Sequence, residues 1–574
     1  MKITKKALAS SLAVAALAIP LAACGSSNSS DDAGKTSPSS SGDTKASATL
    51  ADYNPQPREN LKDGGTFTQP ISEIPEQLNT FQGDADAYAA VIWSYLNPQM
   101  MFFAPDGTWS FNKDYLTDVQ EKDVNGNTVV TYTINPKAKW NDGSPITWES
   151  FKVTAEANSG KDKAYSPSST DGYSKIKSVT QGTDDHQAVV TFDGSWAWWQ
   201  GLFNFILNPH VNSADQFNKA YINNLHPEWG AGPFEVKSFD QKGGVLTLDR
   251  NPKWWGDPAK MDTVTFKQME DTASINAFKN GEIDIVGVGS ADRLSQVKDM
   301  DGITIRRAGS VSTDLLELNG KSPVLTDPNV RKAFFESLDR ETLAQIRYQG
   351  LDYNQPLPGS LNLFSFQDGY QDALTNAGYK YSTEDADKLL DAAGWKVGSD
   401  GIRTKDGKRL SLDYPFVGDD PTLIAQAKAM IAMAKKAGIE VKMRNIPSAD
   451  FGKTFTGGQW DLFALGFSSS DPFGVAYMCQ IYCSDSSLNL SQTGTKEIDA
   501  ELKKLQALPT ADEQIKAAMP LESKIIGETW GMMPTDTRPT IDAVKNGLAN
   551  IGPEPYFGPD LFGMQPVQNV GWEK

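Results

Sequence analysis

The residue types that most often carry catalysis are scarce in this chain and do not form catalytic patterns. Its 574 residues include three histidines, His186, His210 and His226, and none of them lies in an H-E-x-x-H or H-x-x-E-H zinc motif. The sequence also lacks a G-x-S-x-G nucleophile elbow and a G-x-x-x-x-G-K-S/T phosphate loop. It therefore predicts a protein that is not an enzyme and uses no metal and no cofactor.

The N-terminus carries a targeting signal. A short apolar run follows three lysines and ends in Leu21-Ala22-Ala23-Cys24-Gly25, and it is shorter than the roughly 20 residues that a membrane-spanning helix needs. This pattern resembles the lipobox of bacterial lipoproteins. The resemblance implies that residues 1–23 are a signal peptide and that Cys24 carries a diacylglycerol thioether. The alternative is a plain secretory signal followed by an incidental cysteine.

The segment after Cys24 is rich in Ser, Asp, Gly, Thr, Ala and Lys. Residues 25–50 contain no aromatic residue and only Leu50 as a large aliphatic one. Such a segment cannot bury enough apolar area to offset the entropy lost on ordering. The sequence therefore predicts a disordered tether over residues 24–58 that holds a folded body away from a membrane.

Two further cysteines, Cys479 and Cys483, are one helical turn apart, which is within reach of disulfide geometry. In an exported protein, an even remaining pair favours a disulfide. Two thiols without a third ligand nearby make a poor zinc site. The sequence thus favours a Cys479–Cys483 disulfide, with free thiols and a metal site as the alternatives.

The remaining chain has a folded, soluble composition, with 39% hydrophobic and 22% charged residues, and is long enough for two or more lobes. The net charge is −18, and it becomes −21 when the three lysines of the signal peptide are removed. This charge argues against nucleic acid or an anionic bilayer as a direct electrostatic partner.

Strand and helix patterns alternate from about Leu61 onward. Residues 129–134 and 188–192 are β-rich runs, and Gly243-Gly244 signals a hairpin. Asp327 before Pro328 and Ser382 before a stripe of apolar residues predict helix starts. Further helices are expected over residues 424–434 and 498–505, and a half-buried strand over 439–443.

Eight of the 14 tryptophans lie between residues 140 and 255, including the run Trp196-Ala197-Trp198-Trp199. The rings of this run cannot all share one face of a helix or strand. Two interpretations are open for these tryptophans. They pack in the core and at domain edges, or they line an aromatic chamber for a ligand.

A series of short motifs runs in order along the chain. In the first half, the motifs are Gly64-Gly65-Thr66-Phe67, Glu76-Gln77-Leu78-Asn79, the W-N-D-G-S-P-I-T run at 140–147, Gly232-Pro233-Phe234 with residues 248–255, and residues 280–284. In the second half, they are Leu318-Asn319, residues 327–333, Asp339-Arg340, and residues 389–395, 438–441 and 460–462. Together these motifs resemble those of the extracellular solute-binding proteins of family 5, the peptide/nickel-binding group of ABC importers.

The resemblance implies an α/β, two-lobe periplasmic-binding-protein-like (type II) fold with an extra subdomain in the first lobe. We expect lobe I over 59–310 plus 533–574, the inserted subdomain near 95–225, and lobe II over 311–532. The ligand would lie between the lobes, and closure would present the complex to a membrane permease.

The resemblance also indicates where the ligand would bind. In peptide-binding relatives, the strand that matches residues 464–472 pairs with the peptide backbone. Serines stand here where relatives carry an aspartate for the peptide ammonium, and acids at 419–420 replace a His or Arg for the peptide carboxylate. Asp471 either takes the ammonium or caps the following turn. The candidate contacts are Asn79, Phe81, Asp419, Phe467, Ser468, Ser469, Ser470 and Asp471.

The sequence therefore predicts a lipid-anchored, monomeric binding protein on the extracytoplasmic face of the cell membrane, at the cell surface or in the periplasm. It would capture an oligopeptide and deliver it to ABC permease and ATPase subunits, with no nucleic acid partner. One alternative is an oligosaccharide or other polar conjugate bound by the same fold. The other is a surface regulator or adhesin without a transport role.

Overall fold

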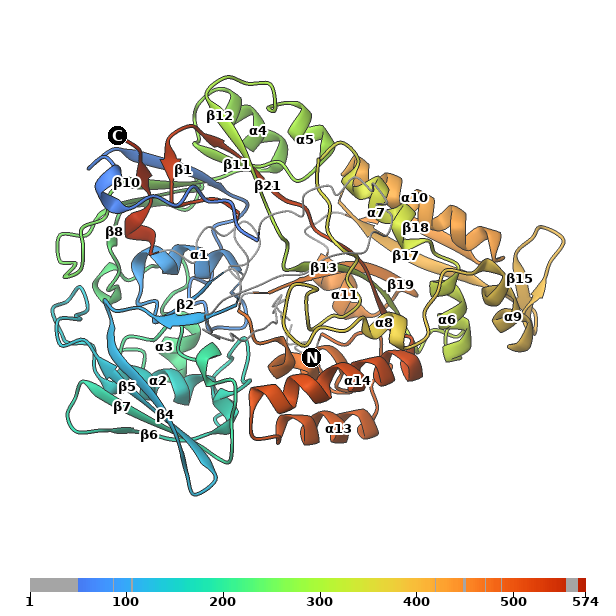
Figure 1. The fold of residues 1–574 in the computed structure, drawn as a ribbon, viewed down its shortest axis with the longest axis horizontal. Helices are drawn as coiled ribbons and strands as arrows, with labels where there is room; N and C mark the ends of the chain where they lie inside the picture. Colours follow the sequence, from blue (N-terminus) through green and yellow to red (C-terminus); the bar gives the residue numbers. More distant parts are fainter. Residues whose placement is uncertain are drawn as a thin grey trace, which may run out of the picture.

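Figure 1 shows the computed structural model of the chain. The signal peptide, Cys24, Asp419 and Ser470 lie outside the residues that the structure describes. In the described part of the chain, no helix is long and apolar enough to cross a membrane. The described residues are 50–85, 87–104, 107–418, 420–446, 451–469, 471–486, 488–553 and 566–574.

A four-stranded sheet in the order β1-β10-β9-β8 forms the base of the first lobe. Burial alternates along β1, so that Phe67 and Ile71 face the core. The predicted hairpin joins β8 and β9, and Gly244 adopts a left-handed φ of +64°, which glycine allows without a steric cost. The strands are β1 (Thr66–Ile71), β8 (Phe234–Asp240), β9 (Val245–Arg250) and β10 (Thr263–Gln268).

A second, antiparallel sheet in the order β4-β5-β7-β6 lies at the lower left of Figure 1. Helix α2 packs against β6 and β7, and Thr147 caps the start of this helix. A buried aromatic group lies between this sheet and α2, and it consists of Tyr132, Phe151 and Phe203. The elements are β4 (Leu116–Val124), β5 (Asn127–Ile134), β6 (Ile176–Gln181), β7 (Gln187–Phe192) and α2 (Trp148–Asn158).

The second lobe, at the right of Figure 1, combines a sheet in the order β19-β13-β20 with the parallel pair β17-β18. Helix α10 begins at Pro421 after its N-cap Asp420 and ends before Gly438, whose φ is +76°. The elements are β13 (Ser312–Leu318), β17 (Ser411–Val417), β18 (Glu440–Ile446), β19 (Leu462–Ser468), β20 (Met532–Thr537), α6 (Pro328–Glu336), α7 (Arg340–Tyr348), α9 (Thr383–Ala392) and α10 (Pro421–Lys436).

The chain crosses between the lobes twice, side by side. One crossing leads from β12 to β13, and the other leads from β20 to β21 through Arg538 and Pro539. The second crossing follows β20, because residues 532–537 pair with β13 in the second-lobe sheet. The lobe boundary predicted from the sequence lies earlier, at 532–533. The first-lobe strands at the crossings are β11 (Ile285–Gly287), β12 (Ile303–Ala308) and β21 (Thr540–Lys545).

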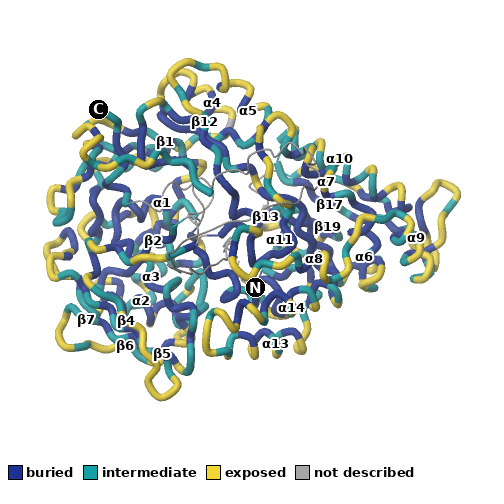
Figure 2. Tube along the Cα trace, viewed as in Figure 1, coloured by how far each residue is buried: buried dark blue, intermediate teal, exposed yellow. Residues whose placement is uncertain are grey.

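The remaining elements complete both lobes, and a layer of buried residues runs through the molecule in Figure 2. Most apolar residues of the first lobe, together with those of α12 to α14, form one core cluster, and α4, α5, β11 and β21 contribute to a separate one. The second-lobe sheet has its own cluster. The remaining elements are α1 (Ala87–Leu96), β2 (Met101–Phe103), β3 (Trp109–Phe111), α3 (Ala214–Lys219), α4 (Asp271–Lys279), α5 (Ala291–Ser295), α8 (Ala373–Asn376), β14 (Lys396–Val397), β15 (Arg403–Lys405), β16 (Lys408–Arg409), α11 (Phe451–Gly457), α12 (Met478–Tyr482), α13 (Lys496–Gln506), α14 (Ala511–Thr529), β22 (Leu548–Ala549) and β23 (Gly571–Trp572).

The last residues of the predicted tether pack on the body. The Asp52 amide donates to the Pro553 carbonyl at 3.0 Å, and Asn54 donates to Glu573 at 2.8 Å. Arg58 donates to the Gln568 carbonyl at 3.0 Å. The folded body therefore begins at about residue 50, before the predicted boundary, because polar side chains between 52 and 58 find partners near the C-terminus.

Four of the tryptophans in the predicted inserted subdomain are core residues. Trp140, Trp196, Trp198 and Trp199 are each at most 5% exposed. The rings of the Trp196–Trp199 run point to different neighbours, as their spacing requires. This burial supports core packing over an aromatic chamber for these four tryptophans.

Candidate ligand-binding site

Strand β19 has a ladder partner on one side only among the described strands. β17 packs along its second side near the start of β19, where the Asp461 amide donates to the Asp413 carbonyl at 3.1 Å. β19 pairs with β13 on the first side, and Ser469 donates its amide to the Val311 carbonyl at 2.9 Å. Backbone groups alternate in direction along an antiparallel ladder, so Gly466 and Ser468 direct their amides and carbonyls away from β13. β19 thus presents backbone donors and acceptors in a form that an extended chain can use.

The predicted serines at the end of β19 are held closely. Ser468 shares a hydroxyl–hydroxyl hydrogen bond of 2.5 Å with Ser312. Ser468 is 7% exposed and Ser469 only 2%, and Phe467 is also buried. The structure brings these three predicted contacts together at one sheet edge, and because all three residues are buried, their direct contact with a ligand stays a prediction.

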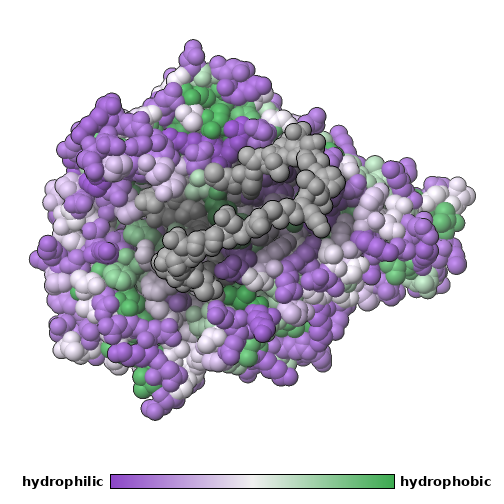
Figure 3. Space-filling view, in the orientation of Figure 1, coloured by the Kyte–Doolittle hydropathy of each residue, from purple (hydrophilic) through white to green (hydrophobic). Residues whose placement is uncertain are grey.

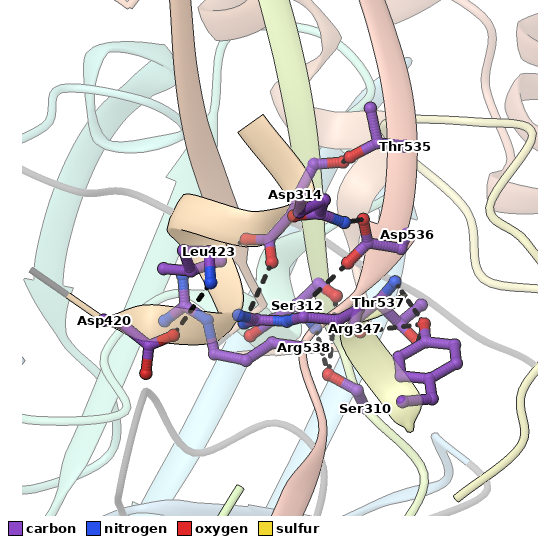
Figure 4. A network of polar contacts seen from close by, with 12 residues as sticks. Ser310, Ser312, Asp314, Arg347, Asp420, Leu423, Thr535, Asp536, Thr537 and Arg538 are labelled. Carbon is purple, nitrogen blue, oxygen red and sulfur yellow. Dashed lines mark hydrogen bonds and ion pairs between the residues drawn. The ribbon is translucent and has the colours of Figure 1, made fainter. Parts of the chain in front are cut away.

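Four charged side chains form what we call the crossover cluster, Asp314, Arg347, Asp536 and Arg538 (Figure 4). Asp314 uses one oxygen for Arg538 at 3.3 Å and the other for Arg347 at 3.4 Å. Arg347 also lies 3.9 Å from Asp536. Burial, followed by the charge of Asp314, raises the pKa of the Asp536 carboxyl, and Arg347 opposes this shift.

Gly466 of β19 lies directly against the crossover cluster. A Cβ atom at this position would lie 2.4 Å from Asp314 Oδ1 and 2.9 Å from Arg538 Nη2. Only glycine leaves room for the ion pair at this point of the sheet. The open edge of β19 and the exposed guanidinium of Arg538 are therefore neighbours.

Asp471 is almost completely buried, and both of its carboxylate oxygens accept hydrogen bonds. The Phe473 amide donates to one oxygen and the Tyr477 hydroxyl to the other, each at 2.8 Å. Burial raises the pKa of Asp471 to about 7, although both hydrogen bonds oppose the shift. These contacts support the interpretation that Asp471 caps the turn after β19, and ligand ammonium binding stays a prediction.

The inserted region meets the segment after β19 in a contact that we call the aromatic seam. Phe473 contacts Phe103 and Trp198, with ring centroids 5.4 Å and 6.0 Å apart. Trp198 donates its indole N–H to Gln514 of α14 at 2.7 Å. Gln480 of α12 donates to Asp171, and Cys479 and Cys483 beside it form a disulfide.

The other predicted contacts lie in the loop after β1. Asn79 is fully buried, and its amide donates to the Phe217 carbonyl at 2.9 Å while its side-chain oxygen accepts from the Phe81 amide. Phe81 is partly buried against Trp93 and Tyr173. These bonds fix the shape of the loop, and direct ligand contact by either residue stays a prediction.

One group of possible metal ligands appears in the described residues, formed by Cys483, Asp485 and Asp499. Cys483 is bonded to Cys479, so its sulfur is not a thiolate. Asp499 accepts from Lys496 at 3.0 Å and from Ser484 at 2.7 Å. This group is therefore explained by a disulfide and ordinary polar pairing.

Sequence reasoning missed the crossover cluster. Asp314, Gly466 and Arg538 are far apart in the chain and carry no shared motif. Only the pairing of β13 with both β19 and β20 brings them together. A glycine inside an apolar strand pattern was the one local signal, since such a glycine often marks a close approach.

The comparisons with known proteins agree with this geometry. The family model for bacterial extracellular solute-binding proteins, family 5, matches residues 116–489. The oligopeptide-binding protein OppA of Mycobacterium tuberculosis (strain ATCC 25618 / H37Rv) is 34% identical over 518 residues, covering 88% of this chain and 85% of that protein.

Two solved structures share the fold at lower identity. The periplasmic EDTA-binding protein EppA has a TM-score of 0.82 at 24% identity, covering 92% of this chain and 99% of that one. The oligopeptide-binding protein AppA from Bacillus subtilis, in complex with a nonapeptide, has a TM-score of 0.73 at 19% identity, covering 90% and 100%.

These findings confirm the predicted α/β, two-lobe fold of the type II binding proteins. They also confirm that the protein is not an enzyme, since its relatives are solute-binding proteins. The chain belongs to the bacterial extracellular solute-binding proteins, family 5.

Proposed function

We propose that this protein captures an oligopeptide between its two lobes and delivers it to an ABC importer. The open edge of β19 is the observation that carries this proposal. Every peptide has an alternating backbone of donors and acceptors, so an edge strand binds it with little dependence on side chains. The oligopeptide-binding relatives named above support the same ligand class.

The surroundings of β19 suit a ligand that brings its own polar groups. The crossover cluster lies at one side of Gly466, and the turn capped by Asp471 follows the strand. The tryptophans of the Trp196–Trp199 run are buried, which weakens one of the two observations that motivated the oligosaccharide alternative. The other observation, the altered residues at the positions that bind peptide termini in relatives, still favours it.

Membrane attachment through a lipid on Cys24 and delivery to ABC permease and ATPase subunits are parts of the same proposal. A body that begins near residue 50 would be joined to Cys24 by a polar segment without large apolar residues, apart from Leu50. Acyl chains would supply the apolar area that this segment lacks. Cys24→Ala should therefore release a folded protein from the membrane fraction, whereas retention in that fraction would contradict lipid anchoring.

Peptide capture is tested first by mass spectrometry of the small molecules released when the purified protein is denatured. Backbone pairing is then tested with one bound peptide synthesised with single N-methyl groups at successive positions. Pairing along one edge uses every second amide, so affinity should fall at alternate positions and stay nearly unchanged between them. An even loss along the peptide would argue against pairing with β19, and recovery of glycans only would favour the oligosaccharide alternative.

A further inference from the structure

Strand β13 carries a glutamate in the interior of the second lobe. Glu317 is fully buried, and neither of its side-chain oxygens makes a hydrogen bond of normal geometry with the described residues. Burial raises the pKa of Glu317 to about 8, and only the backbone amides of Ser491 and Leu490 oppose this shift. No side-chain cation therefore accompanies Glu317, although an ionised carboxylate in the interior is costly without one.

A small cavity lies beside this carboxylate, with space for a guest about the size of a water molecule. Met532, which lines the cavity, stands directly opposite Glu317 in the β13–β20 pair, so both side chains lie on the same face of the sheet. Ser491 lines the cavity too, and its amide approaches the Glu317 carboxylate. The polar residues around the cavity are Tyr482 of α12, Asn489, Ser491 and Thr493 of the following loop, and Thr529 of α14.

The hydroxyl groups that the two helices bring to the cavity have already used their protons. The Tyr482 hydroxyl donates to the Glu522 carboxylate at 2.8 Å. The Thr529 hydroxyl donates to the Ile525 carbonyl, one turn earlier in α14, at 2.7 Å. A hydroxyl has one proton and two lone pairs, so each of these oxygens has only lone pairs left to offer a guest.

The loop residues have the same property. The Ser491 hydroxyl donates to the side-chain oxygen of Asn489 at 2.6 Å, and the Asn489 amide nitrogen donates to the Cys483 carbonyl at 3.3 Å. The proton in the 2.7 Å bond between Ser491 and Thr493 therefore comes from Thr493. Asn489 and Thr493 thus keep free lone pairs on their side-chain oxygens, while their own protons are engaged elsewhere.

We propose that this cavity binds a small alkali cation, sodium or potassium, whose charge is balanced by Glu317. Oxygen lone pairs beside a carboxylate are the ligands that hard cations take. A single carboxylate balances a single positive charge, which favours a monovalent ion over Ca²⁺, whose sites use several charged oxygens. Thr493 is only half-buried and gives the ion a route from solvent. The ion would join β13, α12, α14 and the loop after α12, whatever ligand the protein captures.

The test measures thermal unfolding of the protein by circular dichroism after dialysis into choline chloride. Choline keeps the ionic strength but is too large for the cavity. Replacing it with sodium or potassium should raise the unfolding midpoint by about 2 °C or more, and further with each tenfold rise in concentration, because an ion that binds only the folded state stabilises it by mass action. The larger of the two responses identifies the ion. Equal midpoints in the three salts would overturn the proposal.

Glu317→Gln removes the charge and keeps the shape of the side chain, so its midpoint should be the same in all three salts. Glu336→Gln is the matched control, because Glu336 is a glutamate of the same lobe that is 1% exposed and has one oxygen without a hydrogen-bond partner in the described structure. The control should keep the full response to the alkali cation. A response that E317Q retains would overturn the proposal.

Thr493→Val is the second variant, and it guards against poor folding of E317Q. Valine keeps the shape of threonine and removes one oxygen from the cavity, so the response to the alkali cation should shrink. A response of the parent's size in T493V would show that the ion acts elsewhere on the protein. A midpoint that depends on pH but on none of the salts would show that a proton, and not an ion, neutralises Glu317, and it would also overturn the proposal.

Discussion

The crossover cluster and the aromatic seam both connect the two halves of the molecule, but their chemistry differs. The crossover cluster is built from ion pairs around two adjacent strand crossings, and it includes an arginine that is 44% exposed. The aromatic seam is built from buried rings, since Trp198 and Phe473 are 3% and 4% exposed, and has few polar bonds. Much of the face of the molecule drawn in Figure 3 is hydrophilic.

This difference indicates separate roles. The pair of Arg538 with Asp314 is partly exposed, and an ion pair near solvent contributes little stability, whereas Arg347 and Asp536 lie at the buried end of the cluster. Buried rings contribute through removal from water and close packing, which suits a contact that holds two lobes together. We expect the free energy of unfolding to depend more on the aromatic seam than on the crossover cluster.

The largest effect is expected for Trp198→Ala in the aromatic seam. The variant loses a buried ring against Phe473 and the hydrogen bond to Gln514, so the free energy of unfolding should fall by about 3–5 kcal/mol. Urea unfolding monitored by circular dichroism measures this change. Trp109→Ala is the matched control, because Trp109 is 36% exposed, and it should cost about 1 kcal/mol. Similar losses for both variants would show that Trp198 in the seam contributes no more to stability than the partly exposed Trp109.

The second prediction concerns the pH dependence that Asp471 gives to the region beside the seam. Its pKa is raised to about 7 in the folded protein, while an unfolded aspartate titrates near 4. Between about pH 4 and pH 7, the Asp471 carboxyl keeps its proton in the folded state and has released it in the unfolded state. The contribution of Asp471 to stability is therefore full below about pH 4 and is lost as the pH rises through about 7, by about 1.4 kcal/mol per pH unit.

Asp471→Asn isolates this contribution, because asparagine keeps the shape and can keep the contacts with Phe473 and Tyr477. The stability of the parent minus that of D471N should decline steadily from pH 4 to pH 7. A difference that does not change with pH would show that Asp471 is ionised as easily in the folded state as in the unfolded one. A loss of affinity only for peptides with a free amino group would instead support the ammonium role.

The third prediction addresses the crossover cluster through Gly466→Ala. The added methyl group would lie 2.4 Å from Asp314 Oδ1, so the ion pair must move or the strand must shift. We expect a loss of about 1–3 kcal/mol in the free energy of unfolding and weaker ligand binding. Gly457→Ala is the control, because no atom of the described residues lies within 4 Å of its Cβ position at the end of α11, and it should be neutral or stabilising. Equal stability of G466A and the parent would show that the ion pairs of the cluster rearrange without a cost in the free energy of unfolding.

The two regions also differ in how well the sequence predicts them. The helix caps at Asp327 and Ser382 and the strand alternation over 129–134 are local signals, and the structure has the corresponding elements. Trp198 was recognisable as a large apolar residue, but its partners Phe473 and Gln514 lie hundreds of residues away. Arg538 carried no signal, because a lone arginine after a strand is ordinary until the fold places it against Gly466.

The smallest effect is expected for the disulfide beside the aromatic seam. Cys479 and Cys483 are four residues apart, and closing so short a loop removes little entropy from the unfolded chain. The double variant Cys479→Ala/Cys483→Ala should therefore lose at most about 2 kcal/mol. Urea unfolding of the parent with and without a reducing agent gives an independent measure of the same quantity.

The disulfide has a second consequence, because Gln480 lies between the two cysteines and donates to Asp171 across the seam. If the disulfide holds α12 in the shape that presents Gln480, the losses from Gln480→Ala and from the double alanine variant should not add. A double-mutant cycle should then give a coupling of about 0.5 kcal/mol or more. Additive losses would mean that the disulfide stabilises α12 alone, and the seam would then depend on its rings and on the bond between Trp198 and Gln514.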